Sequence, residues 1–354
     1  MKNSRSLFAL LVLAPLVLAN DWSLEKLAYQ PKAGTTLSKQ FEVEGELEME
    51  DMSLEVDGQD VSEMAGQMQL AMKTTMKLSV TDRYEEVSSE RPAKLVRTFE
   101  EISSNTHMSG NNPMTGPIEQ DVPLESELEG TSVAFTWDED DSAYEVAFEG
   151  DEKGDESLLE NLAEDMDLRG FLPTSEVAQG DTWTIPTEAM KAALAPGGDV
   201  KLRPEGESNP MSGMDQFSQN DMIGDLGGTF EATYGGTREE DGARVAVIKL
   251  KIEARSAQDM TERMAEMKDK MKENMPEGLD FEISTMDMEY ELEAEGELLW
   301  NLEAGLVAAL HLSGEMRLIM DISMNMKMGD QGEKSMDLSQ TYTGTQTITL
   351  TTGE

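Results

Sequence analysis

Apolar and polar residues alternate along unusually long stretches of this chain. Between Met316 and Met328 every second residue is apolar, and the residues between them are almost all polar. Residues 68–80 repeat the pattern near the N-terminus. Because successive side chains of a strand point to opposite faces, the pattern predicts strands with one apolar and one wet face. At about 3.3 Å per residue, each would span about 40 Å.

Other segments also favour strands. Residues 133–148 predict a hairpin with an acidic tip, residues 230–254 predict a strand, a Gly-rich turn and a second strand, and threonines alternate over 341–351. Glu-Gly-Glu-Leu occurs twice, at Glu44–Leu47 and Glu295–Leu298. We therefore expect a mainly β fold of long, curved, half-barrel-like antiparallel sheets, arranged as two similar units.

Helical patterns are few and read as insertions. Residues 157–167 place leucines on one stripe, and residues 187–195 follow Pro186, a good helix start. Residues 256–274 carry methionines at helical spacing and predict an amphipathic helix across a sheet or over its open end. The expected organisation is a signal peptide (1–19), an N-terminal β unit (20–150), a helical and loop connection (151–228) and a C-terminal β unit (229–354). Two Gly/Pro-rich stretches, 109–123 and 196–228, predict loops.

The first twenty residues resemble a targeting segment. Lys2 and Arg5 precede an apolar run that ends in Val17-Leu18-Ala19. This order of charge, apolar run and small residues is typical of a secretory signal, and the run is too short for a membrane anchor. We expect cleavage near Ala19, an extracytoplasmic location, and no integral membrane span.

Charge and composition exclude several functions. The chain of 354 residues has a net charge of −44, which disfavours binding to nucleic acid. It has no cysteine, so disulfides, thiol catalysis and cysteine-based metal sites are excluded. His107 and His311 are the two histidines, and both lie in surroundings that suggest structural roles. The acidic stretches 138–141 and 151–156 lack the spacing of an EF-hand and predict solvated turns. No catalytic residue, metal ligand or cofactor is expected, although a carboxylate-based hydrolase stays open as a less favoured alternative.

Methionine is the distinctive residue, with 27 in the chain. Most of them follow strand or helix spacing, which indicates packing rather than Cu(I) binding. A sheet faced with Met and Leu can also present a deformable apolar trough. Our hypothesis is a non-enzymatic binding protein with an apolar ligand or a lipidated envelope partner in the concavity. The alternative is an envelope structural or assembly factor without a small ligand. The candidate ligand-binding residues are Met68, Met72, Met76, Met316, Met320, Met324 and Met326.

Two short motifs suggest relatives. Val177-Ala178-Gln179-Gly180-Asp181-Thr182-Trp183 resembles the G-D-x-W opening of the second half in a group of exported bacterial β proteins of unknown function. Gly296-Glu297-Leu298-Leu299-Trp300-Asn301, followed by Gly305, is similar to their strand-turn-strand signature. The resemblance implies long curved sheets. It implies no activity and assigns no functional residue.

Overall fold

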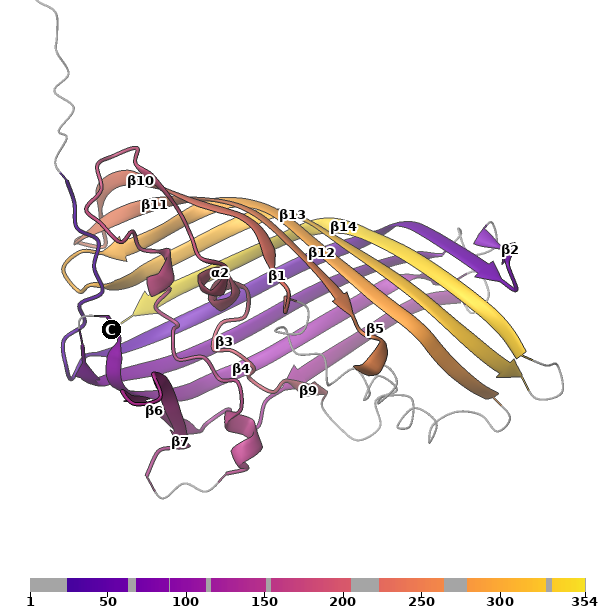
Figure 1. Cartoon of the computed structure of the whole chain (residues 1–354), viewed down its shortest axis with the longest axis horizontal. Coiled ribbons are helices and arrows are strands. Elements are labelled where there is room, and N and C mark those ends of the chain that lie inside the picture. Colours follow the sequence, from indigo (N-terminus) through magenta and orange to yellow (C-terminus); the bar gives the residue numbers. More distant parts are fainter. Residues whose placement is uncertain are drawn as a thin grey trace, which may run out of the picture.

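The computed structural model describes residues 24–62, 68–88, 90–112, 116–150, 154–204, 223–263, 279–328 and 333–353. Their strands form one large antiparallel sheet (Figure 1). The strands are β1 (Thr36–Val56), β2 (Gln59–Asp60), β3 (Gln69–Val87), β4 (Pro92–Asn112), β5 (Gly116–Glu125), β6 (Ser132–Asp138), β7 (Ala143–Phe148), β8 (Thr182–Thr184), β9 (Arg203–Pro204), β10 (Gly227–Glu240), β11 (Ala243–Asp259), β12 (Leu279–Asn301), β13 (Leu306–Met328) and β14 (Glu333–Gly353). The expectation of a mainly β fold with long antiparallel strands and few helices is confirmed.

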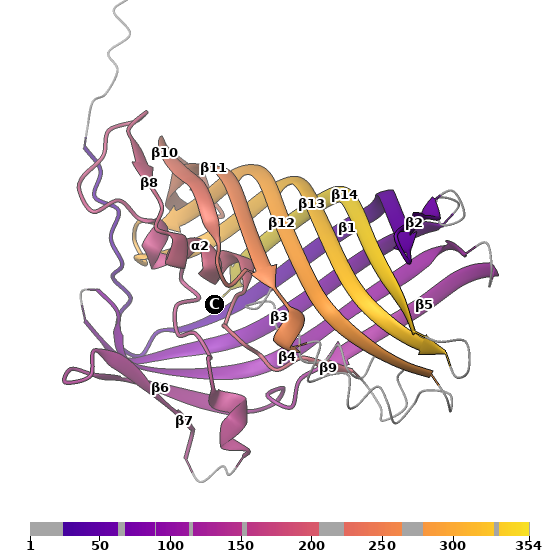
Figure 2. The same cartoon turned by 45° about the vertical axis from the view of Figure 1, so that its right-hand side comes forward.

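The strands form one continuous sheet, in which the first and last long strands are neighbours. Its strand order is β7-β6-β4-β3-β1-β14-β13-β12-β11-β10-β8, and the short strands β2, β5 and β9 lie off this path. Strands β1 and β14 pair from Ser38 opposite Gly353 to Val56 opposite Met336, so the first and last long strands join the two strand-rich parts of the chain. Because β7 and β8 end the path without pairing to each other, the sheet stays open. It curls into a trough (Figure 2).

The two faces of the trough differ in chemistry. On β1, Glu44, Glu46 and Glu48 are exposed on the convex face, while Phe41 and Val43 are buried on the concave face. The same alternation continues on β12, where Glu293 and Glu295 are exposed beside buried neighbours. The acidic residues therefore coat the outside, and the apolar residues line the inside.

Four glycines lie close together on the four central strands of the sheet. They are Gly45 on β1, Gly344 on β14, Gly314 on β13 and Gly296 on β12, and each lies two residues in register from the glycine on the neighbouring strand. At Gly314 a Cβ atom would overlap the carbonyl oxygen of Glu293 on the neighbouring strand. Glycine kinks of this kind allow a sheet to curve. We call these four residues the glycine band.

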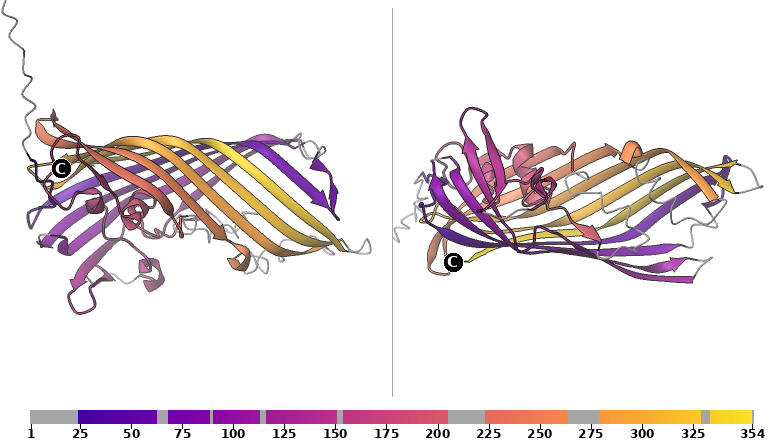
Figure 3. Two further views of the ribbon diagram at one scale, coloured as in Figure 1. Left: turned by 45° about the horizontal axis from the view of Figure 1, so that its top comes forward. Right: turned by 90° about the horizontal axis from the view of Figure 1, so that it is seen from below.

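One end of the trough is filled. The segment 154–204, which includes helix α2 (Thr187–Leu194), packs into this end (Figure 3). Met190 and Leu194 of α2, Phe171, and Trp300 of β12 are buried in the resulting core. Burial of large apolar side chains, each worth about 1.5–3 kcal/mol, stabilises this closed end.

Of the three predicted helices, one is confirmed, one is wrong and one was predicted to begin too early. The prediction at 187–195 is confirmed by α2. The prediction at 157–167 is wrong: the structure has the 3₁₀ turn η1 (Glu156–Leu159) followed by irregular backbone, because Ala163 bonds outward, its N–H to Gly197 and its carbonyl to Arg97. The helix predicted over 256–274 begins too early, since residues 256–259 extend β11; residues 264–274 lie outside the described residues, as do residues 1–19.

The stretch 109–123 is mostly strand rather than loop. It includes the end of β4 and most of β5, which pair from Asn112 opposite Gly116 to Ser103 opposite Glu125. On its other side, among the residues that the structure describes, β5 pairs with β9 at Leu124 and Glu125 alone. The rest of this edge contains Pro117 and Pro123 and the acidic residues Glu119 and Asp121.

Candidate functional site

From the glycine band outward, away from α2, the concave face is rich in methionine. We call this the distal methionine surface. Its methionines are half-buried. Two pairs of them lie directly opposite each other on neighbouring strands, Met72 with Met108 and Met324 with Met336. Met320 lies opposite the buried Met288. The members of the surface are Met49, Met52, Met72, Met108, Met316, Met320, Met324, Met326 and Met336.

The strand register brings several predicted residues together. Met72 of β3 and Met320 of β13 pack against the same buried cluster, which includes Met288 and Tyr342. Met324 and Met326 continue the surface along β13, and both are half-buried. Met68 lies just before β3 and is also half-buried.

Of the predicted residues, Met76 lies outside the distal methionine surface and Met316 lies at its inner edge. Met76 is only 2% exposed and belongs to the closed core near α2, not to the distal surface. Met316 lies on the glycine band, where its Cε would be 3.6 Å from a Cβ atom at Gly45, across β14. It packs against the edge of the closed core and fills the space that the glycines leave.

The distal surface carries no charge over most of its length. Between the glycine band and the Met324–Met336 pair, every concave-phase side chain of β12, β13, β14 and β1 is uncharged. Lys334, opposite Met326, is the first charged residue beyond it. Over this length the surface therefore presents mainly apolar side chains and no charged group.

A second feature lies at the filled end: a buried ionic network. Lys39 Nζ lies 2.7 Å from Asp82 Oδ2 and 2.7 Å from Asp167 Oδ1. Arg97 binds the same Asp82 through Nε at 2.7 Å and Nη2 at 2.9 Å. The side chains of Lys39, Asp82 and Arg97 are 0% exposed. Bidentate pairing and full burial make this the strongest charge interaction described in the protein.

The network attaches the segment 154–204 to the sheet. Arg97 donates hydrogen bonds of 2.8 Å to the carbonyl oxygens of Ala163 and Glu164. The hydroxyl of Tyr84 donates to Asp167 at 2.8 Å. Strands β1, β3 and β4 therefore all hold one short stretch of irregular chain in place. The network thus fixes the segment 154–204 against the sheet.

Burial and charge pull the pKa values of this network apart. Burial alone would raise the pKa of Asp82, but Arg97 and Lys39 lower it to about 2. Burial raises the pKa of Glu164 to about 7, against the opposing effect of Arg169, with which it forms an ion pair. Glu164 Oε1, Arg169 Nη1 and the hydroxyl of Tyr29 are buried without a hydrogen-bond partner. Glu164 thus has a charged form that the fold destabilises.

The alternation of apolar and polar residues in the sequence did not predict this network. Lys39, Asp82 and Arg97 each occupy the apolar phase of their strand, between residues such as Leu37 and Phe41. A charged residue at such a position on three segments was the available signal, since buried charges require partners.

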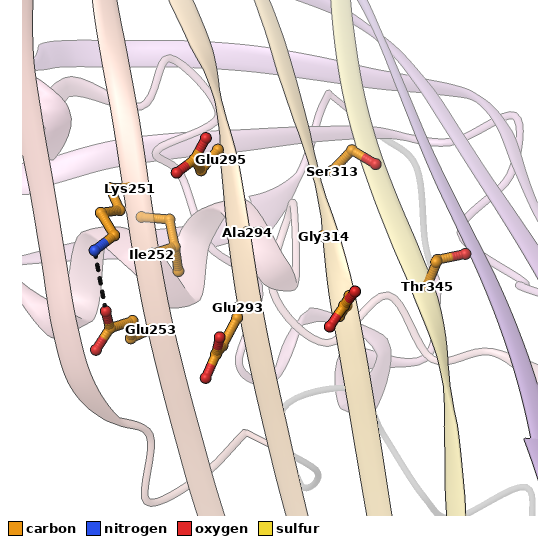
Figure 4. A pocket seen from close by; sticks show the side chains of 10 residues that line it. Lys251, Ile252, Glu253, Glu293, Ala294, Glu295, Ser313, Gly314 and Thr345 are labelled. Carbon is orange, nitrogen blue, oxygen red and sulfur yellow. Dashed lines mark ion pairs between the residues drawn. The ribbon is translucent and has the colours of Figure 1, made fainter.

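A depression of about 620 Å³ lies on the opposite, convex face (Figure 4). Its rim is acidic, with Glu253, Glu293 and Glu295, and Lys251 Nζ lies 3.3 Å from Glu253 Oε1. In the described part of the chain no group of three or more His, Asp or Glu residues could hold a metal ion. Because it lies on the convex face, the depression is separate from the distal methionine surface and from the buried network.

The two resemblance motifs have structural contacts. Asp181 Oδ2 accepts a 2.8 Å hydrogen bond from the amide of Ala178, which closes the turn before β8. Trp183 Nε1 donates to the carbonyl of Phe171, and Trp300 Nε1 donates to the carbonyl of Ala28. These residues fasten loops to the sheet.

Comparisons with known proteins add little. No known protein family and no curated protein matches the chain. Among solved structures, the transport unit of the autotransporter AIDA-I from Escherichia coli aligns at 9% identity, covering 92% of this chain and 94% of that chain, with a TM-score of 0.17. A likeness at this level supports no conclusion about either fold or function. Among the described residues, no helix has the length and apolar character needed to cross a membrane.

Proposed function

We propose that this protein is an exported, non-enzymatic carrier that holds the acyl chains of an uncharged lipid on the distal methionine surface. The observation that supports this proposal is the uncharged, half-buried, methionine-rich concave face beyond the glycine band. Methionine side chains are flexible and polarizable, so they adapt to chains of varied shape. Export rests on the signal-like residues 1–19, and the weak motif resemblance to exported β proteins agrees with it.

Charge selects the class of occupant. The net charge of −44 repels anionic molecules, and the acidic residues coat the convex face. The distal surface itself offers no cation between the glycine band and the Met324–Met336 pair. A neutral lipid such as a diacylglycerol therefore suits the trough better than a free fatty acid or a phosphorylated lipid.

The experiment measures binding and stability in the same variants. A fluorescent diacylglycerol should bind the parent protein and should bind Met324→Gln more weakly, with little change in melting temperature, because Met324 is half-buried. Met76→Gln is the matched control: Met76 is 2% exposed in the closed core, so this change should lower the melting temperature.

Three ligands separate the possible occupants. The diacylglycerol is compared with a free fatty acid of equal chain length and with an acylated lipopeptide. Preference for the diacylglycerol supports the proposal, whereas binding of the lipopeptide alone replaces the lipid by a lipidated partner. If none of the three binds, the carrier proposal is abandoned in favour of an envelope structural or assembly factor.

A further inference from the structure

The sulfur chemistry of this chain is unusual because it is all of one kind. The chain has no cysteine, so each of its sulfur atoms is a methionine thioether. A thioether reacts with two-electron oxidants to give a sulfoxide, which is polar and chiral. Leucine and isoleucine offer similar apolar area without a reactive atom.

Methionines are distributed unevenly between the two ends of the trough. The closed core consists mainly of Leu, Ile, Val, Phe and Tyr, and its methionines Met76, Met166 and Met190 are at most 2% exposed. The distal methionine surface has nine half-buried methionines. Among the methionines that the structure describes, those that solvent reaches therefore lie mainly on the face that we propose holds the lipid.

We propose that the distal methionine surface is a redox-modification site, at which a peroxide oxidises thioethers to sulfoxides and so ends binding of the apolar occupant. In each event the sulfur attacks one peroxide oxygen, an S–O bond forms and the O–O bond breaks. The other oxygen leaves as water after taking up a proton, so the thioether loses two electrons and the peroxide gains them. The release step rests on the proposed lipid function, whereas the modification step does not.

The strand register concentrates the effect. Met72 lies opposite Met108, and Met324 lies opposite Met336, so neighbouring sulfoxides place dipoles side by side on one face. The first protein charge on this phase is Lys334, opposite Met326, and an acyl chain on the surface would have to bury the sulfoxide dipoles. Burial of unpaired polar groups is unfavourable, so we expect a few sulfoxides to prevent binding.

The experiment treats the folded protein with hydrogen peroxide and maps oxidised residues by peptide mass spectrometry. We expect the half-buried distal methionines to gain one oxygen each while Met166 and Met190 stay unmodified. The affinity for the fluorescent diacylglycerol should fall about tenfold or more, which corresponds to about 1.4 kcal/mol. A methionine sulfoxide reductase should restore it.

The matched control replaces sulfur and keeps size. A variant that combines Met316→Leu, Met320→Leu, Met324→Leu and Met326→Leu should bind the probe like the parent and keep more of its affinity after peroxide, since Leu and Met are close in volume. Equal loss of affinity in both proteins overturns the release step. Oxidation of Met166 and Met190 as fast as the distal methionines overturns the modification site. If the untreated parent binds no probe, the lipid proposal and the release step fail together, while the oxidation map still decides whether the site exists.

Discussion

Lys39 Nζ lies 2.7 Å from Asp167 Oδ1, and both side chains are buried although the two residues are far apart in the sequence. Lys39 belongs to β1, at the centre of the sheet, and Asp167 belongs to the irregular segment that fills one end of the trough. This contact joins the two parts of the core, together with the hydrogen bonds that Arg97 and Tyr84 donate to the same segment. Its energetic weight follows from burial, because the interaction of two charges strengthens and the cost of leaving one unpaired rises when water is excluded.

Replacing this lysine should therefore destabilise the protein strongly. Lys39→Met leaves Asp82 and Asp167 without one of their cations and should lower the free energy of unfolding by about 3–5 kcal/mol. Lys73→Met is the control, since Lys73 Nζ lies 2.6 Å from Glu46 Oε1 but the two side chains are 54% and 61% exposed. Exposed pairs contribute about 0–1 kcal/mol. Urea unfolding of both variants tests the difference, and equal effects would contradict the assignment.

Glu164 should make stability depend on pH around neutrality. Its pKa of about 7 lies above the ordinary value of 4.5, so the folded state holds the proton more tightly than the unfolded chain. The resulting stabilisation is complete below about pH 4.5 and is lost as pH rises through about 7. Glu164→Gln removes this dependence, so the parent should lose up to about 3 kcal/mol more than the variant between pH 4.5 and pH 8. Parallel slopes for the two proteins would show that Glu164 does not titrate there.

Within the glycine band, Gly296, Gly314 and Gly344 should tolerate no side chain, because a Cβ atom at each would overlap a backbone carbonyl oxygen of a neighbouring strand. Gly314→Ala places a Cβ atom against the carbonyl oxygen of Glu293 and should cost about 2 kcal/mol or more. Gly227, the first residue of β10, has open space around its Cβ position, so Gly227→Ala should leave the melting temperature nearly unchanged. Thermal unfolding compares the two. A similar small effect at both glycines would mean that the sheet bends without them.

Export can be checked directly. The signal-like residues 1–19 predict that the mature chain begins at or near Asn20. N-terminal sequencing of protein from the envelope fraction should find that residue first. Protein that starts at Met1 would exclude cleavage.

The sequence predicted the strands well because period-two alternation is a local signal. It runs unbroken through Met316–Met328 on β13, and the register then places Met72 and Met320 near one buried cluster. The partition between open and filled ends is not local. Met76 follows the same alternation as Met72, yet it lies in the closed core because the segment 154–204 covers it.

Other features depend on contacts that no short window contains. Residues 157–167 have helical spacing, but Arg97 on β4 takes the carbonyls of Ala163 and Glu164, and the backbone leaves the helical path. The buried Lys39, Asp82 and Arg97 interrupt the apolar phase of three strands, and their pairing appears only once the strands align. Tertiary hydrogen bonds outweighed helix propensity here.

The edge strand β5 determines how the trough can be used. Among the described residues, most of β5 has no partner on its outer side, and such an edge normally recruits another chain; Pro117 and Pro123 withhold amide donors, and Glu119 and Asp121 repel a second acidic copy. The sheet can therefore stay open along its side in free solution without polymerising. Under the proposed carrier function, a long lipid would enter the trough sideways, and its exchange would need neither threading from one end nor unfolding of the filled end.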